Sequence, residues 1–153
     1  MGWRSILLFD FRRDKGVKML KKIALSLIVA SSLFASEKIF VVERESSSLA
    51  VIENDKFKNR MENFRNTNHS VVKFYKDEAY AISRDGYVIK FDPKKEIIEA
   101  EYKTSKSAIG FEISEYFVAV ANYDDKSVDV LTKDLKPLKK IVTNSRNVGI
   151  KLY

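Results

Sequence analysis

The strongest constraint on this 153-residue chain is an apolar pattern that recurs about every 40 residues. Strand-like segments that end in a polar residue close at Ile52, Phe91 and Leu131, which are separated by 39 and 40 residues. The segments that precede the last two, 79–83 and 117–121, also resemble each other. A fixed period near forty with four short strands per unit is the signature of β-propeller blades, which bury their two apolar faces by stacking on neighbours.

Short polar turns separate the expected strands, and the turn at 84–86 supplies a glycine that can adopt positive φ. Phe57, Met61 and Phe64 have helical spacing, but the segment 55–65 is short, and we expect an irregular connection there. The expected strands are 38–43, 48–53, 70–75, 79–83, 87–91, 97–102, 108–113, 116–121, 127–131 and 137–142.

The predicted fold class is therefore all-β, with four-stranded antiparallel blades of a propeller. The first blade is incomplete and the second and third are complete, whereas known propellers close with about four to eight blades. Open sheet edges aggregate or recruit partners, so we expect this chain to be the N-terminal piece of a longer protein and to be inactive by itself. A plain β-sandwich is the alternative architecture.

The N-terminal residues predict export. Basic residues at 21–22 precede an uncharged apolar run of about 13 residues, 23–35, as in a helical signal peptide over 19–36. The run is shorter than the ~20 residues of a spanning helix, although an uncleaved anchor or a core helix would also fit. We expect residues 1–18 to be a leader upstream of the natural start, and 37–153 to be the partial propeller.

Composition excludes several function classes. The net charge of +7 resides mostly in residues 1–35, which hold seven basic and two acidic side chains, so the remainder lacks the basic character of a nucleic-acid-binding surface. There is no cysteine, which excludes disulfides, thiolate catalysis and c-type haem attachment. Nucleophile-elbow motifs and a ladder of calcium ligands are also missing from the sequence.

Five polar residues fall at corresponding turns of the predicted blades: His69, Arg84, Asn122, Tyr123 and Arg146. His69 is the only histidine and precedes the innermost strand of the second blade, where a neutral imidazole could bind a metal at the central channel. Guanidinium groups bind carboxylates through a two-pronged fork, and a tyrosine ring stacks on flat ligands. This set suits a tetrapyrrole with acidic side chains, while hydrogen-bonded turn residues and solvated charges are the alternative.

The order of these motifs resembles the d1-haem propellers, and within them the NirF-type accessory proteins. The Arg-Asp-Gly turn at 84–86 lies in the middle of the resemblance, which extends over 38–153. The matching runs are 40–52, 69–74, 78–92, 107–111, 118–123, 128–131 and 145–149.

This resemblance implies an eight-bladed periplasmic propeller that binds d1 haem or a d1-haem precursor during maturation of the nitrite reductase of denitrification. It implies that His69 is the ligand of the haem iron and a catalytic residue, and that Arg84, Asn122, Tyr123 and Arg146 lie near the haem face or its carboxylates. Any enzymatic role would be a late, oxidoreductase-like biosynthetic step. Nitrite reductase and other maturation proteins are the implied partners.

Two other function classes remain open at the level of sequence. An exported propeller can serve as a non-enzymatic scaffold for protein–protein interaction, because propellers host many functions. A periplasmic dehydrogenase or lactonase propeller is the other alternative, although the metal-binding carboxylates of a lactonase are not recognisable here.

Overall fold

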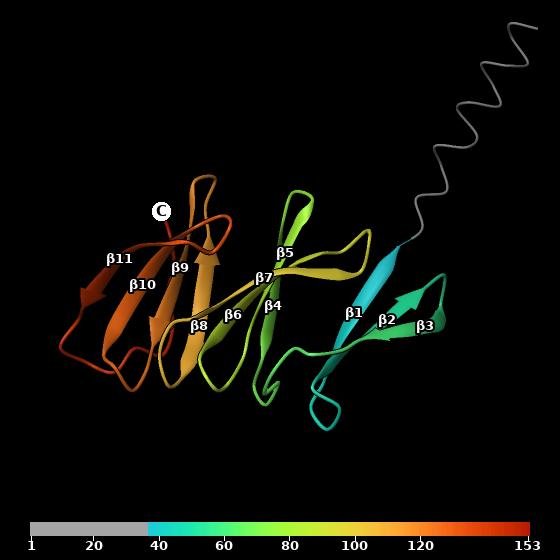
Figure 1. The fold of residues 1–153 in the computed structure, drawn as a ribbon, viewed down its shortest axis with the longest axis horizontal. Helices are drawn as coiled ribbons and strands as arrows, with labels where there is room; N and C mark the ends of the chain where they lie inside the picture. Colours follow the sequence, from blue (N-terminus) through green and yellow to red (C-terminus); the bar gives the residue numbers. More distant parts are fainter. Residues whose placement is uncertain (1–36) are drawn as a thin grey trace, which may run out of the picture. The chain divides into compact units, whose positions relative to one another are not determined.

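The computed structural model describes residues 37–153, which form eleven β-strands and no helix. The strands are β1 (Lys38–Glu43), β2 (Ser48–Glu53), β3 (Lys56–Met61), β4 (Val71–Tyr75), β5 (Glu78–Ile82), β6 (Tyr87–Asp92), β7 (Ile97–Lys103), β8 (Ala108–Ile113), β9 (Phe117–Asn122), β10 (Ser127–Thr132) and β11 (Pro137–Val142). They form three antiparallel meanders: the first sheet β1-β2-β3, the central sheet β4-β5-β6-β7 and the third sheet β8-β9-β10-β11 (Figure 1). This confirms the all-β prediction of blade-like sheets with an incomplete first member.

The prediction of an irregular connection over 55–65 is wrong, because its first half forms β3. Asn54 and Asp55 both have positive φ, 53° and 61°, which is the geometry of a two-residue type I′ hairpin turn. That turn folds β3 back onto β2, with Leu49 opposite Met61. The spacing of Phe57 and Met61 therefore has no helical meaning: Met61 is buried in the core, while Phe57 is exposed.

The predicted signal segment lies outside the described residues. Within 37–153 no helix is long and apolar enough to cross a membrane.

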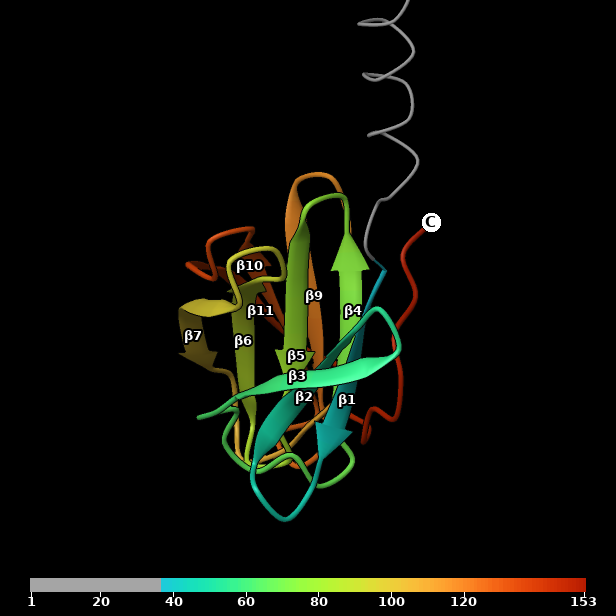
Figure 2. The ribbon, with the colours of Figure 1, turned by 90° about the vertical axis from the view of Figure 1, so that its right-hand side faces the viewer.

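The central sheet is covered on both faces, which explains why its middle strands are apolar at almost every position. Successive residues of a strand point to opposite faces. Ala79 and Ala81 of β5 accordingly join the cluster shared with the first sheet, whereas Tyr80 and Ile82 join the cluster shared with the third sheet. Figure 2 shows the three sheets one behind another. This serial stacking excludes the two-layer sandwich.

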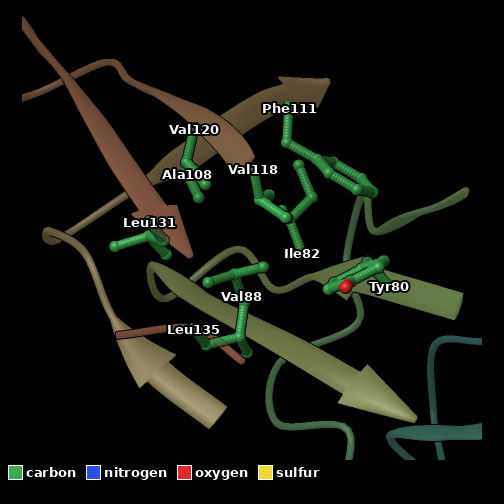
Figure 3. Close-up of a cluster of buried hydrophobic side chains, with 9 residues drawn as sticks. All are labelled: Tyr80, Ile82, Val88, Ala108, Phe111, Val118, Val120, Leu131 and Leu135. Carbon is green, nitrogen blue, oxygen red and sulfur yellow. The ribbon is translucent and has the colours of Figure 1, made fainter. Parts of the chain in front are cut away.

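The two interfaces differ in their side chains. Between the first and central sheets, four phenylalanines contact one another, and the rings of Phe64 and Phe91 meet edge to face at 5.3 Å. Between the central and third sheets the core is mainly aliphatic, built around Val88, Val120 and Leu131 with the buried ring of Tyr80 (Figure 3). Burial of these side chains is the main stabilising contribution, since each contributes about 1.5–3 kcal/mol.

Candidate functional site

Each meander brings alternate connections to the same end of the sheets. The lower end, so named from its place in Figure 1, comprises the connections 44–47, 62–70, 83–86, 104–107, 123–126 and 143–147. The upper end comprises the turns 54–55, 76–77, 93–96, 114–116 and 133–136. Every one of the five residues predicted as a site lies at the lower end, either on these connections or, for Asn122, at the last position of β9.

Three equivalent hairpins, β1–β2, β5–β6 and β9–β10, close at the lower end by the same device. In each, the residue that ends the first strand is joined by a side-chain hydrogen bond to the residue that begins the second. The three bonds link Glu43 with Ser48 at 2.7 Å, Ser83 with Tyr87 at 3.0 Å, and Asn122 with Ser127 at 3.1 Å. The residue before each second strand has positive φ, and the three are Ser47, Gly86 and Lys126.

Gly86 is the position where this geometry requires glycine. Its φ is +85°, and a Cβ there would lie 2.1 Å from the carbonyl oxygen of Ser105. The close approach lets the Gly86 carbonyl accept a hydrogen bond from the Thr104 amide at 2.9 Å. The β5–β6 turn is thereby fixed to the connection that leaves β7.

His69 is exposed on the connection between β3 and β4, in the left-handed region with φ of 58°. Its segment is held from both sides. The Ser70 amide donates to the carbonyl of Thr67 at 3.0 Å, and the Thr67 hydroxyl donates to the carbonyl of Glu43 at 2.8 Å. The imidazole therefore stands on a connection fixed to the neighbouring hairpin. Among residues 37–153, no cluster of three acidic, His or Cys side chains could hold a metal ion by itself.

Arg84 is exposed in the β5–β6 turn and lies beside the same connection. Its amide donates to the carbonyl of Asn66 at 2.8 Å, which ties the Arg84 turn to the segment that carries His69. Within the described part of the chain, no carboxylate forms an ion pair with its guanidinium.

Tyr123 and Arg146 are brought together. The guanidinium carbon of Arg146 lies 5.2 Å from the centre of the Tyr123 ring, a cation–π arrangement. Asn147 fixes this pair, since its amide donates to the carbonyl of Ser127 at 2.9 Å and its carbonyl oxygen accepts from Thr143 at 3.1 Å. Arg146 also has no carboxylate partner among residues 37–153.

Asn122 differs from the other four residues because it is fully buried. Its amide donates to Asp129 at 2.6 Å and to Ser127, while its carbonyl oxygen has no protein partner. The Ser107 hydroxyl is the second buried polar atom without a partner in the described range. Asn122 holds the β9–β10 hairpin together, and its contact with a ligand stays a prediction.

Two other arginines of the lower end are neutralised by carboxylates. Arg60 contacts Glu43 through Nε at 2.6 Å and Nη2 at 3.0 Å, and this hydrogen bond, followed by that from Ser48, lowers the pKa of Glu43 to about 2. Arg65 makes a two-pronged contact with Glu101. These pairs serve the structure, whereas Arg84 and Arg146 keep their charge available to an anion.

An open polar groove of about 610 Å³ lies beside this region. It contains none of the five predicted residues, and Arg65 with its partner Glu101 forms part of its wall. Sequence reasoning missed it because strands of two sheets and the β3–β4 connection form it together. The lining residues are Ser46, Ser47, Glu62, Asn63, Arg65, Ile98 and Glu101.

The donor set at the lower end fits a tetrapyrrole with acidic side chains. An exposed imidazole can supply a nitrogen ligand to iron. Two guanidinium groups without acidic partners can bind carboxylates through paired N–H donors. The Tyr123 ring, with Arg146 beside it, can lie against a flat macrocycle.

Comparison with known proteins points in the same direction. Residues 34–150 match the model of the cytochrome D1 heme domain family. A comparison with curated proteins found no match.

Solved structures show the fold. Dihydro-heme d1 dehydrogenase NirN in complex with DHE is 22% identical with a TM-score of 0.59, over 68% of this chain and 24% of that one. AztD from Citrobacter koseri is 15% identical with a TM-score of 0.59, over 73% and 34%. The WD40 β-propeller domain of Doa1 is 15% identical with a TM-score of 0.54, over 71% and 38%. The chain thus has propeller architecture and spans between a quarter and two fifths of these proteins.

Proposed function

This chain belongs to the cytochrome D1 heme domain family, and from that premise we propose that it binds a d1-type tetrapyrrole at the lower end of its sheets. The observation that carries the proposal is that His69, Arg84, Tyr123 and Arg146 gather at this one end. Two of the four contact each other, and the connections that carry the other two are hydrogen-bonded to one another.

Each residue has a distinct proposed role. His69 offers a neutral ring nitrogen to the iron. Arg84 and Arg146 bind peripheral carboxylates, and Tyr123 lies against the ring plane while it orients Arg146. The bound group supplies a redox-active iron, whereas the residues of this chain bind and orient it.

The more specific assignment is a NirF-type accessory protein that acts in the periplasm during maturation of nitrite reductase. The order of the sequence motifs and the apolar run at 23–35 support it. Cell fractionation tests the location: the chain should appear in the periplasmic fraction, and retention in the cytoplasm would contradict export. Co-purification with nitrite reductase under denitrifying conditions tests the partner, and its failure would remove that partner.

The test of the proposed function replaces His69 without disturbing its backbone. Asparagine tolerates the left-handed conformation of this position, so His69→Asn should fold normally while it loses the ring ligand. We expect d1 haem, added anaerobically to the full chain, to bind more weakly to this variant with a changed iron absorption spectrum. His69→Gly should behave alike, and added imidazole should restore the spectrum of the unaltered chain.

The matched control is Lys136→Ala, which removes an exposed charge at the upper end. It should bind d1 haem as the unaltered chain does. An unchanged spectrum in both His69 variants would remove His69 from the ligand role, and the absence of any d1-haem binding by the unaltered chain would refute the proposed function.

A further inference from the structure

The equivalence of the three lower hairpins identifies a residue that the sequence prediction did not include. Glu43, Ser83 and Asn122 close the first strands of these hairpins by the same kind of hydrogen bond. The residues that follow them are therefore equivalent positions of successive sheets: Arg44, Arg84 and Tyr123. Two of the three belong to the proposed binding residues, and Arg44 is the counterpart of Arg84 in the first sheet.

The connection that carries His69 touches both arginine-bearing turns. On one side, the hydroxyl of Thr67 donates to the carbonyl of Glu43 at 2.8 Å and approaches that of Arg44 at 3.5 Å. On the other side, the amide of Arg84 donates to the carbonyl of Asn66 at 2.8 Å. The backbones of Arg44 and Arg84 thus flank the segment that leads to His69.

The charge of Arg44 is not compensated by the protein. Arg44 is exposed and forms no ion pair within residues 37–153. The carboxylate before it, Glu43, is already engaged by Arg60, and the one after it, Glu45, makes no ion pair with it. Since Arg60 and Arg65 show that this end supplies acidic partners where a structural ion pair is needed, an unpaired guanidinium at the position of Arg84 indicates a ligand.

We propose that Arg44 is a further specificity-determining residue, which binds a carboxylate of the same planar, polyanionic ligand that His69 and Arg84 hold. The inference rests on the proposed function for the identity of that ligand. Arg44 and Arg84 then recognise two acidic groups on either side of the His69 segment, so the site selects rings with free carboxylates over rings whose carboxylates are esterified.

The test titrates the full chain with d1 haem and with its carboxylate-esterified form, followed by absorbance. Arg44→Ala should weaken binding of the free acid about tenfold, the size of a lost hydrogen bond to a charged group, and leave the esterified form unchanged. Arg44→Lys should lie between, because an ammonium keeps the charge but loses the fork. Thermal unfolding verifies that both variants fold. Affinities of Arg44→Ala within twofold of the Lys136→Ala control would overturn the proposal.

A second measurement separates this proposal from the proposed function. Citrate titrated into the full chain should shift the Nε–H NMR signals of Arg44 and Arg84 with one common dissociation constant, and Arg44→Ala should raise that constant for Arg84. If the unaltered chain bound no tetrapyrrole but gave this result, the proposed function would fail while the anion-binding role of Arg44 held. An absence of citrate-dependent shifts at Arg44 would overturn that role.

Discussion

The two ends of the sheets differ in how they compensate their charges. At the upper end, Lys90 is nearly buried and contacts Glu78 at 2.9 Å and Asp134 at 3.0 Å. Also at this end, Glu96 accepts hydrogen bonds from Lys38 and Lys58. At the lower end, Arg44, Arg84 and Arg146 are exposed without a carboxylate partner among the described residues. One end uses its charges to fasten turns to sheets, and the other keeps cations available.

The pKa shifts follow this division. Burial alone would lower the pKa of Lys90, but hydrogen bonds to Glu78 and Asp134 outweigh it and raise that pKa. Burial likewise opposes the charged form of Glu78, yet the hydrogen bonds from Lys133 and Lys90 lower its pKa overall. Such stabilised charges hold structure together. A guanidinium without an acidic partner contributes little to folding, and its position is better explained by a ligand.

The largest expected effect comes from removing the buried cation of the upper end. Lys90→Ala leaves Glu78 and Asp134 without their shared partner, and we expect the free energy of unfolding to fall by about 2 kcal/mol. This is below the cost of breaking a fully buried pair, because Asp134 is exposed. Urea denaturation measures it. The affinity for d1 haem should stay unchanged.

The double variant Lys90→Met with Glu78→Gln sharpens this result. It replaces the pair by groups that need little charge compensation, so part of the lost stability should return. If the single variant instead weakened d1-haem binding and left stability intact, the division between the ends would be wrong.

The next effect should be the reverse of the first. Arg84→Ala removes an unpaired guanidinium, and we expect d1-haem affinity to drop about tenfold, equivalent to about 1.4 kcal/mol. The free energy of unfolding should change by less than ~0.5 kcal/mol, as for other surface substitutions. Titration followed by absorbance and urea denaturation of the same sample measure both quantities. A clear loss of stability with unchanged affinity would give Arg84 a structural role.

The smallest effect concerns the pH dependence of the upper end. Hydrogen bonds from Lys38 and then Lys58 lower the pKa of Glu96 from 4.5 to about 2. Its stabilising contribution is therefore complete above pH 4.5 and is lost as pH falls towards 2. Glu96→Gln should be about 1 kcal/mol less stable at neutral pH and lose less stability across that window. Denaturation at a series of pH values measures this, and identical slopes for both chains would contradict the assignment.

The strands were largely predictable from the sequence because alternation and polar turns are local signals. The boundaries of β2 and β8 agree with the sequence prediction. The failure at β3 is instructive, since Lys56, Lys58 and Arg60 make it too polar to resemble a core strand. The signal that could have found it is the Asn54–Asp55 pair, which is typical of a type I′ turn.

For the candidate site, the sequence located residues but not their partners. The 40-residue period placed Arg84 and Tyr123 at equivalent turns, and the structure confirms that His69 and Arg146 lie at the same end. Arg44 was missed because its equivalence to Arg84 depends on which residues close the hairpins, and these closing bonds are made by side chains.

The sequence by itself determined the repeat, the strand order and the end of the sheets at which the polar turns lie, because these depend on contacts between neighbouring strands. Only the tertiary structure decided which charges are compensated. Arg60 and Arg65 find carboxylates on other strands, whereas Arg44 and Arg84 do not. The physical reason is that an ion pair requires its two groups within about 4 Å, and folding, not sequence separation, sets that distance.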